Sequence, residues 1–111
     1  MIIYDVDGVS VDAVYNTFDG DNVEGYRYNW AANGMSGSVH FQMGNPKKTG
    51  LNGLTTEAIL AILIHRTEVV DSKVPCRENK TAINFMERAL ETLESRKRDR
   101  IARKVYGEQK Q

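Results

Sequence analysis

The sequence predicts an α+β protein in which an antiparallel sheet of about four strands, over residues 1–50, is followed by a two-helix hairpin over residues 51–111. Val, Ile, Tyr, Phe and Trp are concentrated in the first part, with two-residue alternation in Val9–Ala13 and Val39–Met43. Turn-forming dipeptides separate these segments, and from Leu54 onward the apolar residues recur at helical spacing. At 111 residues, we expect one domain built from these two parts.

The strands are predicted at residues 2–6, 9–15, 23–30 and 35–43, with the sequences IIYDV, VSVDAVY, VEGYRYNW and MSGSVHFQM. The separators contain residues that favour tight turns: Asp7-Gly8, Asp19-Gly20-Asp21-Asn22, Asn33-Gly34 and Gly44-Asn45-Pro46. Connections this short favour an antiparallel meander, because parallel strands need long crossover connections.

The first helix is expected to begin at Thr55 or Thr56, which can cap it, with Glu57 in the first turn beside the positive end of the helix dipole. The stretch Ala58–Ile64 that follows is apolar on every side. A helix of this kind must be buried on every side, and one small sheet can cover only one of its faces. We therefore expect a partner subunit.

The second helix is predicted from roughly Cys76 to Lys104, with Pro75 acceptable in its first turn after a break at residues 71–75. Its apolar residues repeat at spacings of 3, 4 and 3, as in the seam of a helical hairpin: Ile83, Met86, Leu90 and Leu93. Asn79 falls inside this seam. It is either a buried polar residue that fixes the pairing register or an amide that contacts a ligand.

The end of the second helix carries a concentration of charge in a chain whose formal net charge is zero. Six basic residues stand against Asp99 alone: Arg96, Lys97, Arg98, Arg100, Arg103 and Lys104. At about 100° per residue, Arg96, Arg100 and Arg103 share one flank with Phe85. Guanidinium groups there suit a phosphate-binding pocket wall. The alternative is a solvated helix end, where cations also suit the dipole.

Other kinds of site are not supported by the sequence. His40 and His65 lie far apart without neighbouring cysteines, so we expect no metal site. We identify no nucleophile paired with a base, and we expect neither catalysis nor a cofactor. The single cysteine, Cys76, suits a reducing compartment and is expected to be a small buried residue. The sequence MIIYDVDG lacks the features of a secretory signal, and no stretch is long and apolar enough to span a membrane.

Three segments of the second half resemble the C-terminal helical hairpin shared by phage proteins that sequester cyclic nucleotide signals. They are NGLTTEAILAILIHRTE, PCRENKTAINFMERALETL and RKRDRIARKVYG. The CREN and RxxDRxAR elements are specific, and the strands that precede them make residues 36–107 most similar to the Thoeris anti-defence family of the first type.

This resemblance implies a protein of the infected bacterial cytoplasm that binds a cyclic ADP-ribose isomer, made by TIR-domain enzymes, without cleaving it. Relatives form dimers that can assemble into hexamers, and some also take cyclic di- or trinucleotides at separate sites. The motifs place ligand-binding roles on Asn79, Arg96 and Arg100, and Val69 or Val70 stands where relatives often have an aromatic residue. The full set of candidate ligand-binding residues is Arg96, Arg100, Asn79, Arg77, Arg103, Phe85 and Val69.

Two other functions are alternatives, and the first of them uses the same arginines. A small phage protein associated with nucleic acid would place them on a phosphate backbone, although residues 1–50 carry a net charge of −3 and such domains are usually basic throughout. An enzyme that processes ADP-ribose would release a changed ligand. The salt dependence of the binding affinity distinguishes nucleic-acid association from binding in an enclosed pocket, because backbone binding weakens steeply with salt. Recovery of unchanged ligand distinguishes sequestration from catalysis.

Overall fold

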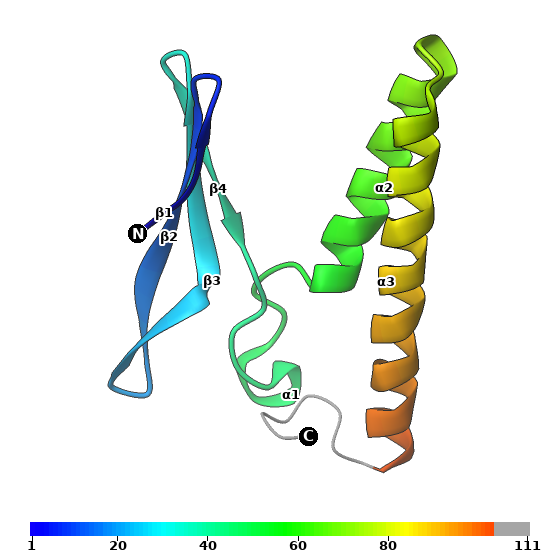
Figure 1. Ribbon diagram of the computed structural model, residues 1–111. Helices are drawn as coiled ribbons and strands as arrows, with labels where there is room; N and C mark the ends of the chain where they lie inside the picture. The colour runs from blue at the N-terminus through cyan, green and yellow to red at the C-terminus, as the bar shows by residue number, and fades with distance from the viewer. Residues whose placement is uncertain (104–111) are drawn as a thin grey trace. The chain divides into compact units, whose positions relative to one another are not determined.

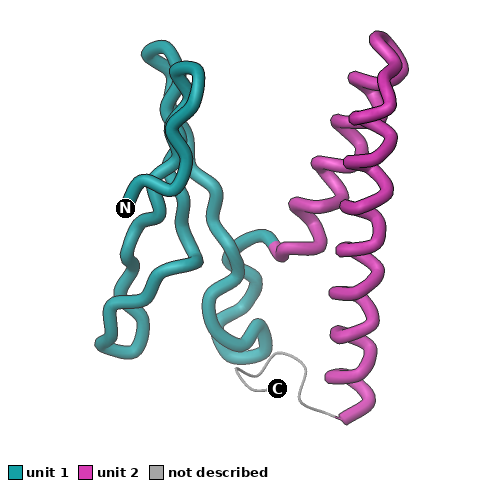
Figure 2. The backbone as a smooth tube through the Cα atoms, in the orientation of Figure 1, with its two compact units in different colours: residues 1–54 teal, residues 55–111 magenta. Residues whose placement is uncertain are grey.

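The computed structural model describes residues 1–103 and divides the chain into two compact units (Figure 2). The first, Met1–Leu54, is called the sheet unit, and the second, Thr55–Gln111, is called the hairpin unit. Strands make up most of the first unit, and long helices make up the described part of the second (Figure 1), so the predicted α+β class is confirmed. The division between the two units falls between Leu54 and Thr55.

The sheet is an antiparallel meander of β1 (Ile2–Val6), β2 (Val9–Phe18), β3 (Asp21–Ala32) and β4 (Met35–His40), in that spatial order. Each connection is a two-residue turn, Asp7-Gly8, Asp19-Gly20 or Asn33-Gly34, in which both residues have positive φ. Such turns match the twist of antiparallel strands, and Asp, Asn and Gly tolerate the left-handed backbone they require. The sequence therefore sets the strand order through its turn residues.

The two faces of the sheet differ in polarity, as the register shows. Directly paired residues share a face, and one face carries Val11, Ala13, Tyr28, Trp30 and Val39. The opposite face carries Ser10, Asp12, Asn29 and Ser38, with a hydrogen bond of 2.7 Å from Ser38 Oγ to Asn29 Oδ1. Among the described residues only Ala13 is buried, and the other apolar residues named on this face are half-buried in a single chain.

The chain leaves the sheet through a compact joint. Gln42 N–H donates to the Leu54 carbonyl (2.9 Å) and Leu54 N–H donates to the His40 carbonyl (2.8 Å). Gly53 is required there because a Cβ atom would lie 2.5 Å from the Phe41 carbonyl carbon. Between the two bonded segments of chain lies a short helix, α1 (Pro46–Thr49), which is capped by Asn45. This helix is absent from the sequence-based prediction, which placed only a turn at residues 44–46.

The hairpin unit consists of α2 (Thr56–Lys73) and α3 (Arg77–Ala102). Thr55 caps α2 as predicted, because its Oγ1 accepts a hydrogen bond of 3.1 Å from Ala58 N–H. The half-buried residues of α3 include the predicted seam of Ile83, Met86, Leu90 and Leu93, and those of α2 include Leu60 and Ile64. Two helices packed along one apolar stripe leave their outer surfaces exposed.

Three sequence-based expectations for α3 need correction or fall outside the described residues. Cys76 is exposed rather than buried, because it is the cap of α3 and its Sγ accepts a hydrogen bond of 3.4 Å from Asn79 N–H. Pro75 precedes that cap and therefore lies outside the first turn. The helix ends at Ala102, and Lys104 lies outside the described residues.

Candidate functional site

The basic residues at the end of α3 form part of a small cleft at the open end of the hairpin. Its walls are Thr56 and Glu57 from the first turn of α2 and Leu93, Arg96, Lys97 and Arg100 from the last turns of α3. Its volume is about 110 Å³. Arg100 is half-buried, while Arg96 and Lys97 are exposed. The structure thus brings Arg96 and Arg100 together on one wall, one turn apart.

The neighbouring basic residues lie outside this cleft. Arg103 is 55% exposed and forms an ion pair of 2.9 Å with Asp99, one turn earlier on the same helix. Arg98 lines a separate shallow hollow with Glu94 on another side of α3. The predicted grouping of Arg96 and Arg100 is therefore found in the geometry, whereas Arg103 is directed to a partner on its own helix.

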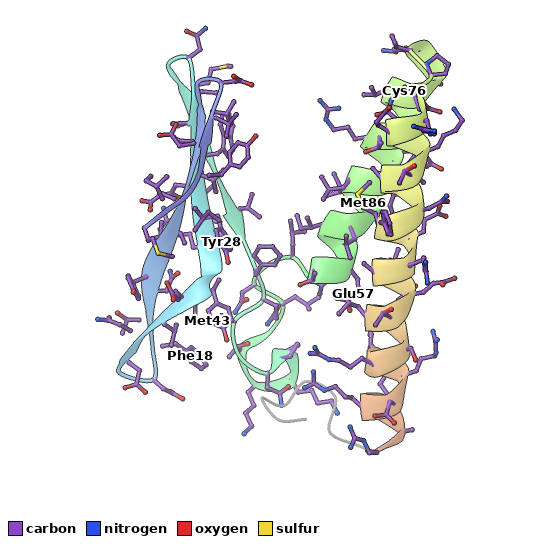
Figure 3. The ribbon with its side chains drawn as sticks, in the orientation of Figure 1. Phe18, Tyr28, Met43, Glu57, Cys76 and Met86 are labelled. Atoms are coloured by element: carbon purple, nitrogen blue, oxygen red, sulfur yellow. The ribbon has the colours of Figure 1, made fainter. Side chains whose placement is uncertain are left out.

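Asn79 and Arg77 lie at the closed end of the hairpin. Figure 3 shows Cys76, next to them in sequence, at the opposite end from Glu57. Asn79 is half-buried within the seam and Arg77 is exposed. Arg96 follows Asn79 by 17 positions of continuous helix, which amounts to about 25 Å along the axis. One chain therefore does not bring Asn79 and the arginines into a single site.

An acidic side chain organises this closed end. The Asp71 carboxylate accepts hydrogen bonds of 3.0 Å from both Cys76 N–H and Lys80 Nζ. These two interactions, with a smaller contribution from the Asn79 side chain, lower the pKa of Asp71 below its ordinary value of 3.8. The half-buried position of Asn79 suits both readings of this residue, the one that fixes register and the one that contacts a ligand.

The apolar candidates are open to solvent in a single chain. Phe85 is 65% exposed on α3, about 9 Å along the axis from Asn79 and about 16 Å from Arg96. Val69 is exposed on α2, as are Ile62 and Leu63 from the stretch expected to need a partner. An exposed aromatic ring and several exposed aliphatic side chains on one hairpin are typical of surfaces that are covered in an assembly.

Within residues 1–103 the structure has no cluster of His, Cys, Asp and Glu suited to a metal ion. In the same described part of the chain, neither long helix is apolar enough over its length to traverse a bilayer.

The fold and the cleft together define a class, a small α+β protein whose helical hairpin has a cleft lined by arginine and lysine side chains at its open end. No family model matches the chain. A protein of Bacillus phage SBSphiJ7, described as Thoeris anti-defense 1, is 37% identical over 75 residues. The match includes 67% of this chain and 53% of that relative, so the chain spans about half the length of the curated relative. The chain belongs to the Thoeris anti-defence family of the first type, which confirms the resemblance seen in its motifs.

The candidate ligand-binding set of the sequence analysis includes Arg96 and Arg100 but not the other four cleft residues, Thr56, Glu57, Leu93 and Lys97. Glu57 was assigned only a helix-dipole role. Its spacing of three and seven residues before Leu60 and Ile64 places it on the same stripe of α2, which faces α3. This spacing is the feature of the sequence that could have predicted a position for Glu57 between the two helices.

Proposed function

We propose that this protein is a phage counter-defence factor that binds a cyclic ADP-ribose-type signal, glycocyclic ADP-ribose from TIR-domain enzymes, and so blocks Thoeris immunity. The observation that carries the proposal is the pairing of Arg96 and Arg100 on one wall of a cleft, in a chain of this family. The signal is made inside the infected bacterium, so the protein acts in that cytoplasm.

The chemistry of the cleft suits a pyrophosphate. Guanidinium groups present parallel N–H donors that match phosphate oxygens, and two of them one helical turn apart can grip adjacent phosphates. The cleft volume of about 110 Å³ is well below the roughly 300–1,000 Å³ of pockets that enclose a drug-sized ligand. The cleft of one chain would therefore hold the phosphates and leave the base and sugars to other surfaces.

A second copy of the chain would supply those surfaces. Because Asn79 and Arg96 lie about 25 Å apart along α3, both contact one ligand only if they come from different copies. Two α3 helices that cross in antiparallel orientation bring Asn79 of one copy toward the arginines of the other. The exposed Phe85 lies between these positions, where it can cover the partner helix or the ligand base. We therefore propose a dimer as the minimal binding unit, with hexamers as its higher assembly.

The proposal is one of binding without turnover. Arginines, a lysine, a threonine and one carboxylate make a binding wall, and bound signal is expected to leave unchanged when the protein is denatured. Cyclic di- and trinucleotides are further ligands to test at separate sites, because the resemblance of the motifs implies them.

Calorimetry against a panel of cyclic nucleotides tests this function directly. We expect one cyclic ADP-ribose isomer to bind tightly, and chromatography of the heat-released ligand to return that isomer intact. Catalytic formation of ADP-ribose or another cleavage product would refute sequestration, and an absence of binding to every cyclic ADP-ribose isomer would refute the ligand class.

Nucleic-acid association is the second candidate, favoured by the exposed basic residues Arg98 and Arg103 outside the cleft. Backbone binding weakens steeply with salt because counterions are released. A duplex or single strand that binds with a steep salt slope, while cyclic nucleotides do not bind, would select this candidate.

A further inference from the structure

We infer that Glu57 determines the selectivity of the cleft: its carboxylate accepts hydrogen bonds from ribose hydroxyls beside the phosphates and repels anions that lack such hydroxyls. The inference rests on the proposed function, since it names what reads the sugar of the same ligand. Figure 3 shows Glu57 in the first turn of α2, within the hairpin unit.

The position of Glu57 is unusual for an anion site. It shares a cleft of about 110 Å³ with three cations, Arg96, Lys97 and Arg100, so the wall has two more positive than negative charges. A site built only to attract phosphate would gain from a neutral residue here. An acid in the first turn does interact favourably with the helix dipole. That role needs no particular side of the helix, whereas Glu57 lies on the stripe that faces α3 and is half-buried.

The donor and acceptor inventory of the cleft explains what the carboxylate adds. Arginine and lysine only donate hydrogen bonds, so the three cations can hold phosphate oxygens. They offer no acceptor to a hydroxyl. An ionised carboxylate only accepts, and a Glu or Asp that binds ribose hydroxyls beside a bound pyrophosphate is a recurrent arrangement in nucleotide sites. Thr56, in the same cleft, can donate or accept. Cations and carboxylate together therefore match a ribosyl phosphate.

The inference predicts that Glu57→Gln changes two affinities in opposite directions. Inorganic pyrophosphate should bind about threefold or more tightly, because a repelling charge is removed from the cleft. The cyclic ADP-ribose isomer that binds best should bind about tenfold more weakly, because a charged acceptor for its hydroxyls is lost. Calorimetric titration of the intact protein measures both. Changes of equal sign and size for the two ligands would overturn the inference.

A conservative variant separates the two roles of the carboxylate. Glu57→Asp keeps the charge on a side chain that is shorter by one methylene group. The affinity for pyrophosphate should therefore stay within about twofold of wild type, while the affinity for the ribose-bearing ligand falls.

Glu68→Gln is the matched charge control, since Glu68 lies on α2 outside this cleft, and both affinities should stay within about twofold. Glu78→Gln removes the corresponding first-turn acid of α3, and its melting temperature reports the helix-dipole contribution alone. If Glu57→Gln lowers the melting temperature like Glu78→Gln and leaves ligand preference unchanged, the role is structural and the inference is wrong.

Failure of the inference is distinguishable from failure of the proposed function. If the wild type binds a cyclic ADP-ribose isomer and Glu57→Gln binds it equally well, only the inference fails. If no cyclic isomer binds, the proposed function fails. Linear ADP-ribose then replaces the cyclic isomer as the ribose-bearing probe that is compared with pyrophosphate. Loss of preference for ADP-ribose in Glu57→Gln would support the inference in that case. If neither probe binds the wild type, both fail.

Discussion

Replacement of Arg100 by Ala is expected to weaken binding of the cyclic ADP-ribose ligand by about ten- to a hundredfold. Arg100 is half-buried in the cleft beside Leu93, where a guanidinium is better shielded from water than on the open helix. Hydrogen bonds to charged groups contribute about 1.5–3 kcal/mol, and an unpaired partner adds to the loss. Since about 1.4 kcal/mol corresponds to a factor of ten, one such interaction accounts for the expected range.

Arg96 and Arg98 give this prediction its internal comparison. Arg96→Ala should show a loss of similar order, because Arg96 lines the same cleft one turn earlier. Arg98→Ala removes the same charge from the same helix but from a separate hollow beside Glu94. Exposed charges contribute about 0–1 kcal/mol, so its loss should stay below about fivefold. Titration of the three variants against one cyclic isomer is the assay. Equal losses for Arg98→Ala and Arg100→Ala would mean that the arginines act as diffuse charge and that the cleft is not the binding site.

Three further outcomes are expected. Ile62 is 53% exposed in one chain, so Ile62→Asp should change the stability of a monomer little. The same substitution should dissociate an assembly that buries this position, because an unpaired buried charge is strongly unfavourable. Light scattering that shows a monomeric wild type at micromolar concentration would contradict the argument. Ligand released by heat should co-elute with the starting isomer after long incubation with excess signal, and a time-dependent product peak would show turnover instead. The pKa of Asp71 is lowered in the folded state, so its contribution to stability is complete above its ordinary value of 3.8 and is lost as pH falls through the lower folded value. Asp71→Asn should therefore lower the melting temperature near neutral pH, with a difference from wild type that shrinks in acid; a difference that persists unchanged at pH 2 would rule out this linkage.

The strand order and the hairpin were accessible from the sequence because local chemistry determines them. Asp7-Gly8 and Asn33-Gly34 adopt a backbone that few other dipeptides tolerate, so they specify where β1 ends and β4 begins. Thr55 is a capping residue followed by an apolar stripe, which fixes the start of α2. In each case a few neighbouring residues suffice.

The missed features depend on contacts between residues distant in the chain or on competition between local motifs. Asn45 can begin a turn or cap a short helix, and the tertiary bonds that join His40 and Gln42 to Leu54 accompany the helix that forms. Cys76 was expected inside because free cysteines usually are, but the Asp71 carboxylate holds its N–H at a helix start. Where Glu57 lies relative to Arg100 depends on how α2 and α3 align, which no single helix pattern determines.

The short turns of the meander also bear on how the protein forms during synthesis. Every strand pairs with the next along the chain across a two-residue turn, so no strand waits for a later segment to be made, and contacts of low sequence separation are associated with fast folding. All of these bonds lie within the first 54 residues. The sheet unit can therefore form at the ribosome while α3 is still being translated. Helix pairing follows, and in the proposed dimer the encounter of two chains would be the step whose rate depends on how much protein the cell has made.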